Sequence, residues 1–260
     1  MKKINKNFRN KKLIVFDLDG TLAPSKAPAD RDMISLLLRL LEKGSVAVIG
    51  GGKYGLFKEQ LVRRLPKRDE RLERFYLFPT SSTAFYRFSN GKWECIYEHV
   101  LSRADKKKII TAFERVFKEV GYEHPKKTYG PPPLEDRSTQ ITFSALGQKA
   151  PIPLKEEWNK KYDKLRLRMA SMLQKKLKGF KVRVGGLTSI DVTEKGIDKA
   201  YGIRQIEKQL HIPRKDMLFV GDAIFPGGND YAAVKTGVDY VKVKNPEDTK
   251  KLVRFLVGTR

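Results

Sequence analysis

The sequence predicts an α/β protein with a parallel-sheet core and a separate α+β domain inserted into it. Three observations support this prediction: apolar strands alternate with amphipathic helices over the first 80 residues, a hairpin signal interrupts the alternation, and the alternation returns near residue 188. Alternation of this kind is typical of parallel sheets that are covered by helices.

The first 80 residues justify the parallel part of the prediction. β-Branched and aromatic residues favour strands at 13–16, 46–49 and 75–78. Apolar residues recur at helical spacing from about 30 to 43 and from about 53 to 64. The resulting strand–helix–strand–helix–strand series places consecutive strands side by side and parallel.

The middle of the chain predicts antiparallel structure. Two strands flank the turn signal Ser89-Asn90-Gly91, so a hairpin is expected from about residue 81. The further elements expected here are a helix at 104–120, a strand at 139–144, a helix at 154–178 and a strand at 180–184. We therefore expect residues 81–187 to form the inserted α+β domain.

The α/β pattern resumes after Gly185-Gly186. The expected elements are strands at 189–192, 217–220 and 238–243, and helices at 198–210, from 230 and from about 248. Residues 1–80 and 188–260 are thus expected to form one discontinuous, Rossmann-like core domain.

Composition restricts the class of protein. The 260 residues are 40% hydrophobic, which is enough for buried cores. No apolar run approaches the roughly 20 residues that span a bilayer, and the basic amino terminus is not followed by an apolar signal-peptide stretch. The sequence therefore predicts a cytoplasmic protein without a membrane partner.

The formal net charge of +24 raises non-specific affinity for polyanions. The basic residues are spread along the whole chain, and the sequence contains neither a zinc finger nor an aromatic ribonucleoprotein motif. We therefore expect no specific nucleic-acid partner. A catalytically degenerate protein that binds polyanions is the distant alternative.

Two carboxylates follow the first strand. Asp17 and Asp19 alternate with Leu18 and precede the turn signal Gly20-Thr21. Close carboxylates repel each other, and a divalent cation such as Mg²⁺ relieves that repulsion. A carboxylate beside such a cation can attack phosphorus and form an aspartyl-phosphate. The simpler alternative is a solvated acidic turn.

The stretch Asp-Leu-Asp-Gly-Thr at 17–21 resembles motif I of the haloacid dehalogenase superfamily. Residues 219–230, Phe-Val-Gly-Asp-Ala-Ile-Phe-Pro-Gly-Gly-Asn-Asp, are similar to the acidic motif IV of its phosphomannomutase branch. The resemblance implies that the inserted domain is a cap. It implies the large cap that Cof-like sugar phosphatases share with phosphomannomutases.

The resemblance also implies roles for the acidic residues. Asp17 would be the nucleophile and a Mg²⁺ ligand. Asp19 would be the general acid and base, and its backbone carbonyl would bind Mg²⁺. Asp222 would complete the metal site, and Asn229 and Asp230 would support it.

A phosphoryl group also requires positive charge and hydrogen-bond donors. Lys199 matches the motif III lysine at a helix start, although a surface lysine is the alternative. Motif II normally carries a serine or threonine where this chain has Gly52. We therefore expect the backbone N–H groups of Gly51 and Gly52, together with Lys53, to bind phosphate.

Substrate choice is expected to depend on the cap. Ser189 and Asp191 match positions that face the sugar in phosphomannomutases. Arg137 lies in a segment similar to one that carries phosphate-binding arginines, but Gln148 and Gly130 replace two of those arginines. Glutamine supplies neither the charge nor the bidentate geometry of arginine.

These residues predict Mg²⁺-dependent phosphoryl transfer through an aspartyl-phosphate on a small phosphorylated sugar or polyol. A phosphatase is the first expectation, because a mutase must hold a bisphosphate at both ends and Gln148 weakens such a clamp. A phosphomannomutase is the alternative.

Overall fold

The computed structural model describes residues 5–25 and 27–258, and the chain divides into two compact units. The first unit comprises Met1–Glu98 and Ile197–Arg260, and the second comprises His99–Gly196. The expected outer limits of the core, residues 1 and 260, lie outside the described residues. Among the helices of the described part, none is long and apolar enough to cross a bilayer.

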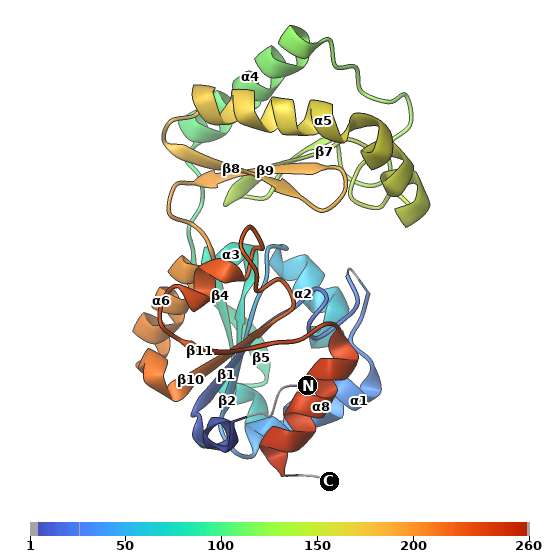
Figure 1. The fold of residues 1–260 in the computed structure, drawn as a ribbon. Coiled ribbons are helices and arrows are strands. Elements are labelled where there is room, and N and C mark those ends of the chain that lie inside the picture. The colour runs from blue at the N-terminus through green and yellow to red at the C-terminus, as the bar shows by residue number, and fades with distance from the viewer. Residues whose placement is uncertain (1–4, 26, 259–260) are drawn as a thin grey trace. The chain divides into compact units, whose positions relative to one another are not determined.

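The first unit is built on a seven-stranded sheet in the order β11-β10-β1-β2-β3-β4-β5 (Figure 1). The neighbouring pairs from β11 to β3 are parallel, and β4 and β5 extend the sheet antiparallel. The strands are β1 Leu13–Asp17, β2 Ser45–Ile49, β3 Phe75–Phe78, β4 Ala84–Ser89, β5 Lys92–Glu98, β10 Met217–Gly221 and β11 Asp239–Lys242.

Helices cover both faces of this sheet. One apolar cluster joins one face to α1 and α8, and another joins the opposite face to α6. The helices are α1 Arg31–Leu41, α2 Tyr54–Gln60, α3 Pro79–Ser82, α6 Lys199–Leu210, α7 Tyr231–Val234 and α8 Pro246–Val257. Short 3₁₀ helices lie at Lys6–Asn10, Val62–Arg64, Glu70–Arg74 and Arg214–Asp216.

The central strand β1 shows why the sequence folds in this way. All five of its residues are buried, and Ile14 and Phe16 join one apolar cluster while Leu13 and Val15 join the other. A parallel strand that is buried on both faces requires such a continuous apolar run. The predicted α/β class with a parallel-sheet core is confirmed.

The second unit is a four-stranded antiparallel sheet in the order β6-β7-β9-β8 with two long helices. Alternate strand residues, among them Ile141 and Ile190, pack with the helices in one apolar cluster. The elements are α4 Arg103–Val120, β6 Leu134–Asp136, β7 Gln140–Ser144, α5 Ile152–Lys176, β8 Phe180–Gly185 and β9 Ser189–Glu194.

One hairpin and one further strand lie in a different unit from the one that the sequence predicted. The hairpin at 84–98 extends the first unit's sheet, where Phe85 stacks on Phe78 with ring centroids 4.5 Å apart. Strand β9 pairs with β7 and β8 in the second unit rather than with the parallel strands. The unit boundaries therefore fall after Glu98 and Gly196, whereas 81 and 187 were expected. Periodicity identified these strands, but it carries no information about which sheet edge a strand joins.

Candidate active site

Three carboxylates meet at the carboxyl edge of the first unit's sheet. Asp17 ends β1, Asp222 follows β10, and Asp230 directly precedes α7. Because β1 and β10 are parallel neighbours in register, their carboxyl ends lie side by side. One oxygen from each carboxylate lies within 4.8 Å of the others. Asp17 and Asp230 are buried, and Asp222 is partly exposed.

Lys199 links two of these carboxylates. It is the first residue of α6, which begins there because the Asp198 side chain accepts a hydrogen bond from the Tyr201 amide at 3.0 Å. Its Nζ donates to Asp17 Oδ1 at 2.5 Å and also to Asp230 Oδ1. Lys199 is 3% exposed, so it is a buried, ion-paired lysine and not a surface lysine.

Burial and mutual charge interactions shift the pKa values of the residues in this cluster. Burial raises the pKa of Asp17 to about 7, the charges of Asp230 and Asp222 add to the rise, and Lys199 opposes it. Burial alone would lower the pKa of Lys199, but the two carboxylates outweigh burial and raise it. The pKa of Asp222 is also raised, first by burial and then by Asp230.

The donor set fits a magnesium ion. Three carboxylates against one ammonium leave the cluster with excess negative charge when ionised, and Mg²⁺ prefers such oxygen ligands. Asp230 is engaged at both oxygens, because Oδ1 accepts from Lys199 and Oδ2 accepts from the Ala223 amide at 2.9 Å. Asp17 and Asp222 are therefore the better ligand candidates, and Asp230 orients Lys199. Within the described part of the chain, no hydrogen bond or ion pair joins Asn229 to the cluster, so its supporting role stays a prediction.

Two glycines permit the close approach of these acidic residues. Gly20 has φ +83°, and a Cβ there would lie 2.6 Å from Asp222 Oδ2. A Cβ on Gly221 would lie 2.4 Å from Asp230 Oδ2. The glycine of the Asp-Leu-Asp-Gly-Thr stretch is therefore required both by its backbone angle and by the space that Asp222 occupies.

Asp19 has a buried partner that the sequence analysis missed. Gln60, the last residue of α2, is 1% exposed. Its Nε2 donates to Asp19 Oδ1 at 3.0 Å and to the Ala27 carbonyl at 3.0 Å. No local pattern distinguishes this glutamine, because its contact with Asp19 arises only from the tertiary fold.

The glycine loop lies at the same sheet edge. Gly50–Gly52 follow β2, whose last residue, Ile49, is in register with Asp17. Lys53 is the residue before α2. Gly51, Gly52 and Lys53 thus lie on the loop beside Asp17's strand, as expected from sequence, but their binding of phosphate stays a prediction.

A strained turn holds this loop from the other side. Thr80, Ser81 and Ser82 after β3 all have positive φ, at 47°, 57° and 68°. The Thr80 amide donates to the Gly52 carbonyl at 2.9 Å, and the Ser81 amide donates to the Gly50 carbonyl at 2.8 Å. Three successive non-glycine residues in this conformation are rare, and strain of this kind is concentrated at functional sites.

The second unit places two of the predicted substrate residues on one sheet face. Thr142 is opposite Asp191 in the β7–β9 register, and its Oγ1 donates to Asp191 Oδ1 at 2.7 Å. Side chains alternate along strands, so Ser189 shares this polar face, which lies opposite the apolar cluster under the helices. Ser189 and Asp191 therefore lie on the same face of this sheet, and their contact with a sugar stays a prediction.

The remaining candidates of the second unit lie beside that sheet. Arg137 follows β6, is mostly buried, and its Nε donates to Glu135 Oε2 at 2.9 Å. Gln148 lies in the turn after β7, and its carbonyl accepts a hydrogen bond from Lys155 Nζ at 2.8 Å. Gly130 has φ +91°, and a Cβ there would meet Lys149 Cγ at 3.0 Å. An arginine at 130 is therefore disfavoured by the backbone itself.

Solved structures share this fold. An IMP-nucleotidase of Plasmodium falciparum superposes with a TM-score of 0.67 at 17% identity, over 96% of this chain and 68% of that chain. A haloacid dehalogenase-like hydrolase from Bacteroides thetaiotaomicron superposes with a TM-score of 0.61 at 16% identity, over 94% and 98% of the two chains. The likeness shows that this chain has the fold of a haloacid dehalogenase-like hydrolase.

Sequence comparison identifies the family. The sequence profile described as eukaryotic phosphomannomutase matches residues 33–258. The phosphomannomutase of Saccharomyces cerevisiae is 28% identical over 251 residues, 94% of this chain and 93% of its own length. That of Encephalitozoon cuniculi is 30% identical over 254 residues, 94% and 92% of the two chains. The chain therefore belongs to the eukaryotic phosphomannomutase family.

Proposed function

We propose that this chain is a hexose-phosphate mutase of the phosphomannomutase type. The observation that carries the proposal is the buried Asp17–Lys199–Asp230 cluster beside Asp222, in a chain that resembles phosphomannomutases along almost its whole length. The full-length similarity supports the mutase above the phosphatase that the cap residues alone favoured.

The first step forms a phosphoryl-enzyme. Lys199 holds Oδ1 of Asp17, which leaves Oδ2 to attack phosphorus. A bond forms between Oδ2 and phosphorus, and the bond from phosphorus to the sugar oxygen breaks. Asp19, oriented by Gln60, gives its proton to that departing oxygen.

The second step returns the phosphoryl group to sugar. Asp19 now takes the proton from a different hydroxyl of the sugar, whose oxygen attacks phosphorus as the bond to Asp17 breaks. Lys199 and the N–H groups of Gly51 and Gly52 would balance the charge of the phosphoryl oxygens. A magnesium ion held by Asp17, Asp222 and the Asp19 carbonyl would supply further positive charge.

Hydrolysis is a second candidate, and specific residues favour it. Gln148 and Gly130 remove two positive charges from the segment that would hold a distal phosphate. If water replaces the sugar hydroxyl in the second step, the same residues release inorganic phosphate. The chemistry at Asp17 is common to both candidates.

Phosphorus NMR of one mixture separates the two candidates. Enzyme, Mg²⁺ and a hexose 1-phosphate are followed with and without a hexose 1,6-bisphosphate. We expect bisphosphate-stimulated exchange between the 1- and 6-positions with little free phosphate. Release of phosphate without exchange would establish the hydrolase instead. Absence of both reactions, with Asp17→Asn behaving like the unchanged protein, would contradict phosphoryl transfer altogether.

A further inference from the structure

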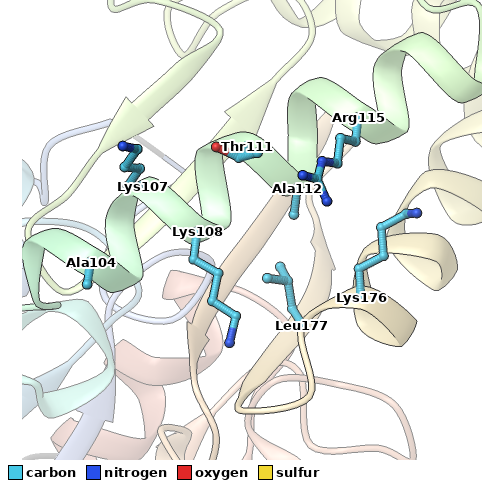
Figure 2. A pocket seen from close by; sticks show the side chains of 8 residues that line it. All are labelled: Ala104, Lys107, Lys108, Thr111, Ala112, Arg115, Lys176 and Leu177. Atoms are coloured by element: carbon cyan, nitrogen blue, oxygen red, sulfur yellow. The ribbon is translucent and has the colours of Figure 1, made fainter.

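A basic groove lies in the second unit, between α4 and the end of α5. Its volume is about 570 Å³, which is in the range of small-ligand sites, about 300–1,000 Å³. Figure 2 shows its lining, in which the side chains of Lys108, Arg115 and Lys176 lie around Leu177. The lining residues are Ala104, Lys107, Lys108, Thr111, Ala112, Arg115, Lys176 and Leu177.

The lining is positive and lacks a compensating acid. Its eight residues, all in the described part of the chain, include four cations and no carboxylate. Lys176 pairs with Glu119 at 2.8 Å, but Lys107, Lys108 and Arg115 make no ion pair with any residue in 5–25 or 27–258. Lys108 Nζ lies over the Phe180 ring, 5.7 Å from its centroid, but a ring does not neutralise its charge. Like charges gathered without acidic partners repel, and a bound anion would remove that repulsion.

The positions of the cations are not explained by helix stability. Lys107, Thr111 and Arg115 follow one another at four-residue spacing, so they form one row along α4. Lys107 and Lys108 lie in the second turn of α4, far from the carboxyl-terminal turn where the dipole of a helix favours positive charge. The positive charge of this row therefore does not stabilise α4.

The chemistry of the lining selects a linear anion over a nucleic acid. None of the eight lining residues is aromatic, and Thr111 supplies their single neutral side-chain hydrogen-bond donor. Single-stranded nucleic acids require stacking platforms in addition to positive charge. Ala112 and Leu177 form a buried apolar floor beneath the cations, which offers nothing to the hydroxyl groups of a sugar.

We propose that this groove is a binding site for short linear polyphosphate, with three or more phosphate groups bound by Lys107, Lys108, Arg115 and Lys176. The site belongs entirely to the second unit and uses none of the residues assigned to phosphoryl transfer. It therefore goes beyond the proposed function and does not depend on it.

Isothermal titration of the full chain with tripolyphosphate tests the proposal. The titration is carried out without divalent metal in about 0.15 M salt, where exposed charges are substantially screened. The test variant is Lys107→Gln/Lys108→Gln/Arg115→Gln. The matched control is Lys160→Gln/Lys164→Gln/Arg168→Gln, which removes the same number and types of exposed cation from α5.

We expect saturable binding that is weakened at least about tenfold in the test variant and less than about twofold in the control. Equal weakening in both variants would show attraction by net charge alone and overturn the proposal. Tighter binding of an oligonucleotide, with the same sensitivity to the test variant, would also overturn it. If the triple variant does not fold, the single variant Arg115→Gln replaces it. Circular dichroism checks its fold, and its binding of tripolyphosphate should also be weaker than that of the unchanged protein.

Discussion

The two units use positive charge in opposite ways. In the first unit Lys199 is 3% exposed and touches two carboxylates, so its position is fixed by partners on β1 and before α7. In the second unit Lys107, Lys108 and Arg115 are exposed and have no ion-pair partner among the described residues. A buried charge must be paired, and the pairing fixes the geometry that chemistry requires. An exposed, unpaired charge is instead available to a ligand.

The largest effect that this comparison predicts is on turnover. Asp17→Asn removes the nucleophile but keeps the shape of the side chain, so turnover should fall by at least roughly 10³-fold while the fold is retained. Mass spectrometry should no longer detect a phosphoryl group on the enzyme. The triple variant Lys160→Gln/Lys164→Gln/Arg168→Gln is the control and should keep normal turnover. Substantial activity of Asp17→Asn would disprove the assignment of the nucleophile.

The buried pairing predicts a large effect on stability. Lys199→Met leaves Asp17 and Asp230 without their counter-charge, and loss of one buried partner costs about 3–5 kcal/mol. Urea unfolding at neutral pH should show this loss, and acidification, which protonates the two carboxylates, should recover part of it. Lys107→Met changes an exposed lysine in the same way and should alter stability by less than about 0.5 kcal/mol. Similar losses in the two variants would contradict the contrast between the units.

The raised pKa of Asp17 predicts a coupling between pH and metal. The folded protein keeps the Asp17 proton up to about pH 7, whereas the unfolded chain releases it near its ordinary pKa of 3.8. Without metal, stability from this group is therefore lost as pH rises through that window. Magnesium favours the ionised form, so it should raise the melting temperature more at about pH 8 than at about pH 5. The pH dependence of this metal effect should weaken in Asp17→Asn, and an equal effect in both proteins would place the metal elsewhere.

Gln60 should affect proton transfer more than binding. Gln60→Met removes the hydrogen bond to Asp19 and keeps a similar volume, so kcat for a sugar phosphate should fall about 10- to 100-fold with little change in KM. A phosphate ester with a good leaving group, such as p-nitrophenyl phosphate, needs no proton from Asp19. Its rate of phosphoryl-enzyme formation should therefore change much less. Equal losses with both substrates would indicate that Gln60 only supports the fold.

The sequence predicted most of the first unit because its signals are local. The continuous apolar run at Leu13–Phe16 specified a strand buried on both faces, and Asp17 followed at its end. The contact of Gln60 with Asp19 could not be predicted, because no local sequence pattern indicates that the two side chains meet in the fold. The hairpin at 84–98 was identified as a hairpin, but its sheet was not, since the deciding contacts are with β3. Strand β9 was likewise identified as a strand but assigned to the wrong sheet, since its deciding contacts are with β7 and β8.

The smallest predicted effect concerns the missing hydroxyl beside Asp17. Gly52 has no positive φ, so its backbone accepts a serine, but a Cβ there would lie 2.4 Å from Leu56 Cδ2. The contact is with the end of a flexible side chain, and Leu56→Ala would remove it. We therefore expect Gly52→Ser/Leu56→Ala to raise kcat/KM about two- to tenfold over Leu56→Ala alone, since one hydrogen bond contributes about 0.5–1.5 kcal/mol net. Steady-state kinetics on the same hexose phosphate provide the measurement. A decrease would indicate that the backbone N–H groups of the glycine loop already bind the phosphate and that a side chain at 52 only obstructs them.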